Sequence, residues 1–254
     1  MNGMLGRPSI GGRAQRRMVR AMPGETAETN RRVGAGPFRV RRRSRLQKLF
    51  DFVTFPVRAV RLFDDDRWGL SSLRTERFDY VAREVQGRCL DVGCGRHNTF
   101  VREFLGGNGV GIDVFRYEGL AEEQIVTDIS HFPFEDATFD SVTFIACLNH
   151  VPRSLRDVEL AEAHRCLRSG GNLIVTMGHP VAEILVHKLI WVYDRLFATN
   201  YDADSERGMD PEEAYYLSTG EITERLERAG FSGVRRKLFA TQWGLNGLFV
   251  GWKK

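Results

Sequence analysis

The fold of this chain is decided by Arg88-Cys89-Leu90-Asp91-Val92-Gly93-Cys94-Gly95. Residues 89–92 predict a short buried strand, and the two glycines that follow predict a sharp turn. Helical signals begin soon after the turn, from Asn98 onward. A strand that ends at Gly-x-Gly and leads into a helix is typical of nucleotide binding. Glycine lets a ligand approach the backbone, and the helix start presents free N–H groups.

Asp91 places a carboxylate directly before this turn. A pyrophosphate at the strand tip would be repelled by that charge, whereas a ligand that carries an ammonium group would be attracted. S-adenosylmethionine joins an adenosine to a positive sulfonium and an amino acid, so Asp-x-Gly-x-Gly suits it better than NAD. A nicotinamide-dependent oxidoreductase would also need a glycine where Asn98 stands, at the sixth position of Gly-x-Gly-x-x-Gly.

The run from Leu90 to Gly95 resembles the first motif of the class I S-adenosylmethionine-dependent methyltransferases. Two later segments are similar to the small-molecule branch of that family, which includes the ubiquinone- and menaquinone-biosynthesis methyltransferases. These segments are the Pro-Phe to Phe-Asp stretch of residues 133–140 and the run Arg-Cys-Leu-Arg-Ser-Gly-Gly at 165–171. The resemblance extends from about residue 73 to the end of the chain. It departs from the family at His97, where a third glycine is frequent.

Strands and helices alternate along this region and are followed by a hairpin of residues 234–240 and 245–252. The pattern predicts a Rossmann-like, doubly wound α/β fold whose seven-stranded sheet is mostly parallel, with one antiparallel strand in the C-terminal hairpin. One of its helices, 154–167, is expected to carry Leu155, Val158 and Ala161 along one face. We place the methyltransferase domain at residues 71–254.

Acidic residues end two further predicted strands. Asp113 closes residues 110–113 and lies 22 positions after Asp91, which matches the spacing of about 20 residues expected for an acid that binds ribose hydroxyls. Asp128 ends the predicted strand 124–128. The resemblance implies that its carboxylate accepts a hydrogen bond from the adenine amino group and that Ile129 covers the ring. The predicted cofactor-binding residues are Asp91, Gly93, Gly95, Asp113, Asp128, Ile129 and Cys147.

Two histidines are candidates for a catalytic base. S-adenosylmethionine is already activated, so the protein mainly has to align the reactants. A hydroxyl acceptor would still need to lose a proton, whereas a phenol or an activated carbon acid would need no base. His150 follows the fourth predicted strand and His179 follows the fifth. The alternative for both is a hydrogen-bonded structural histidine.

Charge divides the chain into two parts. Residues 1–48 contain 13 Lys or Arg and two acidic residues, while the remainder contains 24 basic and 31 acidic residues. The body is therefore mildly acidic, which argues against a nucleic-acid-binding fold. The four cysteines show no metal-type pairing, so we expect no metal and a reduced, cytoplasmic setting. No apolar run approaches the ~20 residues that span a bilayer.

The first 70 residues predict two segments. Residues 1–45 are rich in Arg and Gly and are expected to be a disordered basic tail. Residues 46–70 are amphipathic, and Pro56 argues against one continuous helix. Two alternatives remain for this segment: peripheral membrane contact through 39–63, or an N-terminal cap on the catalytic domain.

A third predicted segment is an insertion at 179–217 with an apolar first half. It is expected to be a lid over a partly apolar acceptor, and the alternatives are a dimer face or part of the core. The sequence thus predicts an S-adenosylmethionine-dependent methyltransferase that acts on oxygen or carbon of a small molecule. The alternatives are a non-catalytic cofactor-binding or regulatory protein of the same fold, and a nicotinamide-dependent oxidoreductase.

Overall fold

The computed structural model describes residues 43–61, 65–181, 195 and 217–254. Nearly all of the predicted basic tail, 1–45, and most of the predicted lid, 179–217, lie outside these residues. Both therefore stay predictions.

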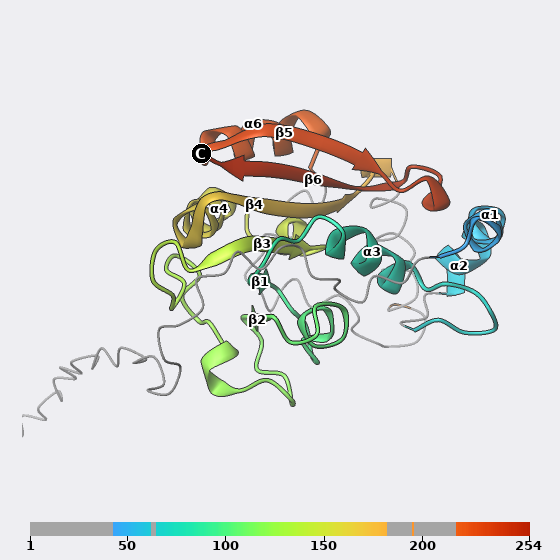
Figure 1. Cartoon of the computed structure of the whole chain (residues 1–254), viewed down its shortest axis with the longest axis horizontal. Coiled ribbons are helices and arrows are strands. Elements are labelled where there is room, and N and C mark those ends of the chain that lie inside the picture. The colour runs from blue at the N-terminus through green and yellow to red at the C-terminus, as the bar shows by residue number, and fades with distance from the viewer. Residues whose placement is uncertain (1–42, 62–64, 182–194, 196–216) are drawn as a thin grey trace, which may run out of the picture. The chain divides into compact units, whose positions relative to one another are not determined.

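Helices and strands alternate along the described chain (Figure 1). The helices and helical turns are α1 (Arg45–Val53), α2 (Phe55–Arg61), α3 (Leu73–Ala82), η1 (Phe100–Phe104), η2 (Glu122–Gln124), η3 (Leu148–His150), α4 (Arg156–Cys166), α6 (Thr219–Arg228) and η5 (Ala240–Gln242). The strands are β1 (Cys89–Val92), β2 (Gly109–Ile112), β3 (Phe139–Ile145), β4 (Leu167–Gly178), β5 (Phe231–Leu238) and β6 (Asn246–Lys253).

The described strands form one six-stranded sheet in the order β2-β1-β3-β4-β6-β5. β2, β1, β3 and β4 are parallel neighbours, and β6 runs antiparallel to both β4 and β5. The mostly parallel α/β sheet with one reversed strand in the C-terminal hairpin is thereby confirmed, whereas the expected count of seven strands is wrong for the described residues.

The missing strand is the one predicted at 124–128. Within it, Ile125 forms an isolated parallel bridge with Asp113, the residue that follows β2. Gln124 ends the turn η2, and the Asp128 carboxylate accepts hydrogen bonds from the backbone N–H and the hydroxyl of Ser130. The η2 turn uses the Ile125 N–H, which donates to Glu122 O at 3.2 Å, and the segment forms one bridge only.

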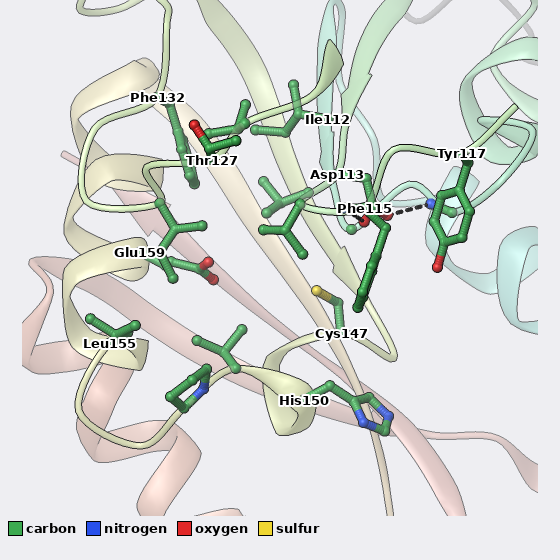
Figure 2. A pocket seen from close by; sticks show the side chains of 18 of the residues that line it. Ile112, Asp113, Phe115, Tyr117, Thr127, Phe132, Cys147, His150, Leu155 and Glu159 are labelled. Atoms are coloured by element: carbon green, nitrogen blue, oxygen red, sulfur yellow. Dashed lines mark hydrogen bonds between the residues drawn. The ribbon is translucent and has the colours of Figure 1, made fainter. Parts of the chain in front are cut away.

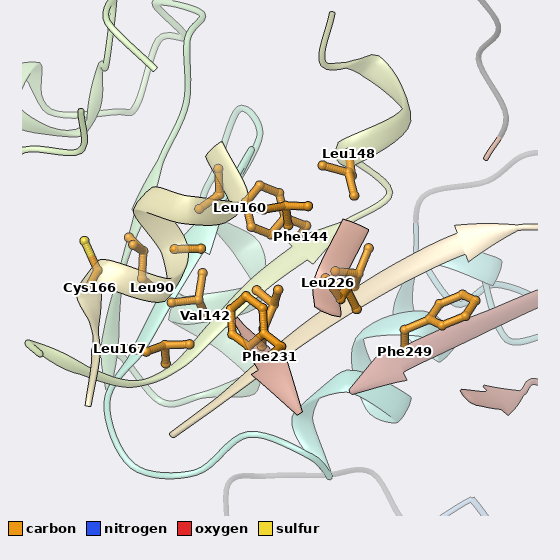
Figure 3. Close-up of a cluster of buried hydrophobic side chains, with 14 of the residues drawn as sticks. Leu90, Val142, Phe144, Leu148, Leu160, Cys166, Leu167, Leu226, Phe231 and Phe249 are labelled. Carbon is orange, nitrogen blue, oxygen red and sulfur yellow. The ribbon is translucent and has the colours of Figure 1, made fainter. Parts of the chain in front are cut away.

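Alternating residues of the central strands build a core on each face of the sheet. In β4, Leu173 and Val175 pack into one cluster, while Ile174 packs into the other. Figure 3 shows the first cluster, which α4 and α6 contribute to through Leu160 and Leu226. The period of two residues follows from strand geometry, and it requires helices on both faces, as in doubly wound folds.

Serine caps start two of the helices, α3 and α6. The Ser72 hydroxyl accepts from the Thr75 N–H at 3.0 Å, and the Ser218 hydroxyl accepts from the Glu221 N–H at 3.1 Å. Each bond satisfies one of the free donors of a first helical turn. The expected break at Pro56 is also present, since α1 ends at Val53 and proline stands in the first turn of α2.

The buried side of α4 differs from the expected face. Val158 is exposed, whereas Glu159, Leu160, Ala163 and Cys166 are buried. The prediction placed the apolar residues of this helix inward and did not consider that a carboxylate would share the buried side.

Candidate functional site

A pocket of about 460 Å³ lies where β1, β2 and β3 end (Figure 2). Parallel strands present their carboxyl ends at one edge of a sheet, and ligands of open α/β sheets bind there. Its lining residues are Val92, Gly93, Gly95, Ile112, Asp113, Val114, Phe115, Tyr117, Val126, Thr127, Ile129, Phe132, Ala146, Cys147, His150, Val151, Pro152, Leu155 and Glu159.

The turn after β1 forms one wall of this pocket and has no room for larger residues at its first glycine. Gly93 has φ +72°, and a Cβ built on it would lie 2.3 Å from Cys147 Sγ. Gly95 has φ +69° and open space around the same direction. Both conformations favour glycine, and the backbone of the turn therefore faces the pocket directly.

Asp113 holds this turn against the end of β2. Its Oδ2 accepts from the Gly95 N–H at 2.9 Å, and its Oδ1 accepts from the Phe115 N–H at 3.0 Å. An ionised carboxylate has about four acceptor positions, so two stay open on a side chain that lines the pocket. The geometry suits a ligand with vicinal hydroxyls.

Asp91 lies beneath the pocket rather than in its wall. It is buried, and its carboxyl oxygen Oδ1 accepts from the Thr143 hydroxyl at 2.7 Å. Burial raises the pKa of Asp91 to about 7; the Thr143 hydrogen bond opposes this rise, and the charge of Asp113 adds to it. Direct contact between Asp91 and a cofactor ammonium stays a prediction.

The predicted adenine-binding pair is divided. Ile129 lines the pocket, but Asp128 does not. The Asp128 carboxylate is exposed, and its hydrogen bonds with Ser130 hold its pKa below the usual range. The structure thus brings Gly93, Gly95, Asp113 and Ile129 together with Cys147, and leaves Asp128 outside.

His150 lies in the pocket wall, next to Cys147, on the turn after β3 (Figure 2). Its Nε2 and the Asn149 side-chain nitrogen are 3.1 Å apart. An amide nitrogen donates, so this contact makes Nε2 the acceptor and places the proton of the neutral ring on Nδ1. Asn149 therefore selects the tautomer of His150.

Comparison with known proteins identifies the domain. Residues 90–175 match the family model described as a methyltransferase domain. These residues form a methyltransferase domain that is similar to the class I S-adenosylmethionine-dependent enzymes. The match spans β1 to β4 and so contains every strand end that forms the pocket.

The chain is similar to two ubiquinone/menaquinone biosynthesis C-methyltransferases, one from Rhizobium etli and one from Brucella anthropi. Each is 29% identical to this chain, over 135 and 156 residues, which are 51% and 57% of this chain. The same shares of the relatives are covered, so the chain spans about half the length of the curated relatives it matches. A solved S-adenosylmethionine-dependent methyltransferase of Thermotoga maritima shares the fold, with a TM-score of 0.51, 18% identity, and coverage of 70% of this chain and 88% of that one.

S-adenosylmethionine, the cofactor of this class of domain, fits the residues of the pocket. The turn at Gly93 allows close approach of a ligand to the backbone, and Asp113 has acceptor positions open for ribose hydroxyls. Two acidic side chains, Asp113 and Glu159, line the pocket, and neither Lys nor Arg is among the described lining residues. A cationic sulfonium is compatible with that electrostatic environment.

The second predicted histidine of the methyltransferase domain lies elsewhere. His179 follows β4 and is not among the pocket-lining residues. Its Nδ1 accepts from the Val181 N–H at 3.3 Å, and its backbone N–H donates to Leu245 O at 2.6 Å. These contacts fit the structural alternative, and a catalytic role stays a prediction.

Sequence reasoning missed several lining residues of the methyltransferase domain. Phe115 and Tyr117 lie just beyond Asp113, Phe132 lies beyond Ile129, and Glu159 reaches the pocket from α4. The aromatic residues stand in loops, where no periodicity points to a wall. For Glu159 a signal existed, because it is one helical turn from Leu155 on the same side of α4.

Proposed function

We propose that this chain transfers the methyl group of S-adenosylmethionine to oxygen or carbon of a small, partly apolar acceptor. The observation that carries the proposal is the meeting of the Gly93–Gly95 turn, Asp113 and Ile129 in one pocket at the ends of β1, β2 and β3. The bound cofactor supplies an activated methyl group. The chain supplies binding and alignment, which are the main requirements of such a displacement.

The lining of the pocket favours a neutral acceptor with apolar surface. Most of its residues are aliphatic or aromatic, and the described lining has acidic side chains but neither Lys nor Arg. An acceptor with a phosphate or carboxylate would meet the Asp113 carboxylate with no Lys or Arg among the described lining residues. The names of the two relatives point in the same direction, because quinone precursors are flat and largely apolar.

His150 has two roles open to it in this proposal. With Nε2 accepting from Asn149, its Nδ1–H is a donor that can orient an acceptor oxygen. If the acceptor hydroxyl must lose its proton, the Asn149 amide has to present its oxygen to Nε2 so that Nδ1 becomes the base. The Asn149 oxygen is buried and has no hydrogen-bond partner among the described residues, so that rotation breaks no bond of the oxygen.

The test is binding followed by turnover. Calorimetric titration of the full chain with S-adenosylhomocysteine and with NADH separates the methyltransferase from the nicotinamide alternative. Incubation with methyl-labelled S-adenosylmethionine and a panel of neutral phenols, hydroquinones and acidic analogues then reports transfer by mass spectrometry. Binding of S-adenosylhomocysteine with no transfer to any acceptor would favour the non-catalytic alternative.

His150→Ala and His179→Ala form a matched pair for the catalytic role. If His150 acts on the acceptor, its loss lowers kcat by ~10²-fold and leaves cofactor affinity unchanged. His179→Ala leaves kcat near the wild-type value if its role is structural. The reverse ranking would move the base to the end of β4.

A further inference from the structure

The N-terminal helices turn their apolar side away from the domain. Leu46, Leu49, Phe50, Phe52, Val53 and Val57 are exposed, and we call these six residues the outer face. Leu46 is 79% exposed and Val53 65%. A helix on a globular protein normally buries its apolar stripe, so α1 inverts the usual pattern, while α2 buries Phe55 and exposes Val57.

Polar contacts on the opposite side hold the helices in this orientation. Asp51 is fully buried and accepts from Arg43 at 3.3 Å. Arg58 is also buried, pairs with Glu76 at 3.0 Å, and donates to the Thr241 carbonyl at 2.8 Å. Rotating the helices to bury the outer face would expose or break these bonds, which is costly for buried charged groups.

The surroundings of the outer face indicate what it contacts. Arg45 and Lys48 of α1 are exposed, and Asp51, the one acidic residue within α1 and α2, is buried. Trp243 packs beside the face and is 50% exposed; its ring lies 6.2 Å from that of Phe52, and its Nε1–H donates to Phe52 O. Exposed aliphatic groups with cations and an amphipathic tryptophan are typical of a helix in a lipid headgroup region.

We propose that the outer face docks on the surface of an anionic lipid bilayer. No helix within the described ranges is long and apolar enough to cross a membrane, so the contact is peripheral. The sequence left membrane contact and an N-terminal cap as alternatives for this segment, and both can hold. The polar side of α1 and α2 caps the domain, and the outer face contacts lipid.

Vesicle sedimentation of the full chain tests this. We expect binding to phosphatidylcholine vesicles that contain phosphatidylserine and little binding to pure phosphatidylcholine. Leu49→Ser/Val53→Ser should lower the partition coefficient at least about tenfold without lowering Tm. Val158→Ser, which changes an exposed valine of α4, is the matched control and should bind as the wild type does.

Three results would overturn the proposal. The double variant could bind as well as the wild type, in which case the basic N-terminal segment alone attracts the lipid. The wild type could bind neither vesicle. Analytical ultracentrifugation could find that the wild type self-associates and the double variant does not, with vesicle binding absent, in which case a second copy covers the face.

A second observation concerns Glu159. This side chain is 3% exposed, points into the pocket in Figure 2, and its Oε2 has no hydrogen-bond partner among the described residues. Buried carboxyl oxygens are nearly always paired in native proteins. An orphaned one that faces a pocket therefore points to a ligand.

The position of Glu159 indicates which part of the bound cofactor it would contact. In Figure 2 it lies across the pocket from Asp113, on the side of Phe132 and Leu155. If the ribose binds Asp113, the base extends toward this apolar side. Adenine has a flat apolar face and an edge with an amino donor beside ring acceptors.

We propose that Glu159 binds the polar edge of the adenine, a role that the sequence had assigned to Asp128. This inference rests on the proposed function. Burial raises the pKa of Glu159 to about 8, so the carboxyl is mostly protonated at neutral pH and can donate to a ring nitrogen while it accepts from the amino group.

Titrations with S-adenosylhomocysteine and with adenosine test the assignment. Glu159→Leu should weaken both ligands about tenfold at pH 7, because the amino group loses its partner. Glu159→Gln keeps a donor and an acceptor and should bind nearly as the wild type does. The affinity of the wild type should fall above pH about 8, where that of Glu159→Gln does not.

The controls separate a failure of the adenine assignment from a failure of the proposed function. Asp113, Tyr117, Cys147 and His150 also line the pocket and can titrate, so only the difference between wild type and Glu159→Gln is read at each pH. If the wild type binds S-adenosylhomocysteine and Glu159→Leu binds it equally well, the adenine assignment is wrong and the proposed function stands. If the wild type does not bind it at all, the proposed function fails.

Discussion

Replacing each glycine of the turn after β1 by alanine is the sharpest test of the site geometry. Gly93 and Gly95 have nearly the same φ, +72° and +69°, so alanine pays the same left-handed backbone cost at both, about 1–2 kcal/mol. Only at Gly93 does the new Cβ collide, at 2.3 Å from Cys147 Sγ and 2.9 Å from its Cβ. Overpacking of this kind adds about 1–3 kcal/mol. Gly93→Ala should therefore destabilise the ligand-free chain more than Gly95→Ala by that amount.

Thermal unfolding followed by circular dichroism measures the difference. One kcal/mol corresponds to a Tm shift of about 2–4 °C in a domain of this size, so the two variants should be well separated. Cys147→Gly removes both colliding atoms, and in a double-mutant cycle with Gly93→Ala it should restore most of the extra loss. Equal Tm values for the two alanine variants, or a cycle without coupling, would refute the packing of Cys147 against Gly93.

Three further predictions concern buried charges. Asp113→Ala should weaken S-adenosylhomocysteine binding by about 1–3 kcal/mol through lost hydrogen bonds, and unchanged affinity in calorimetry would contradict the ribose assignment. Since burial raises the pKa of Asp91 from 3.8 to about 7, the folded state binds its proton more tightly than the unfolded state. The contribution of Asp91 to the free energy of unfolding is then fully present below pH about 4 and is lost as the pH rises through about 7. Tm measured from pH 4 to 8 in a Glu159→Gln background should decline, and adding Asp91→Asn should flatten that decline. Arg58→Met should cost about 3–5 kcal/mol in urea unfolding because Glu76 is left buried without its partner, and a loss below 1 kcal/mol would argue that water reaches the pair.

Much of the fold and part of the site could be predicted from local patterns. The continuous apolar run of β1, the two glycines after it and the 22-residue spacing to Asp113 all act over short distances. Few residue types tolerate the positive φ of Gly93 and Gly95. The turn can therefore be predicted from its glycines without knowing its tertiary contacts. The helix caps at Ser72 and Ser218 are local in the same sense.

Tertiary contacts decided the rest. The orientation of α1 depends on Arg58 of α2, which donates to the Asp51 carbonyl of α1 and to the Thr241 carbonyl. Thr241 lies 183 positions away from Arg58 in the chain. Glu159 is buried because α4 packs against the sheet on that side, whereas an acidic residue taken by itself is expected at the surface. The segment 124–128 has strand composition, but the turn η2 takes up Gln124 and the Ile125 N–H, so it forms a single bridge. Sequence alone determined where the backbone turns after β1 and that Asp113 follows the end of β2, since those features arise from neighbouring residues. The structure determined which side chains face the pocket, since that orientation depends on partners far along the chain.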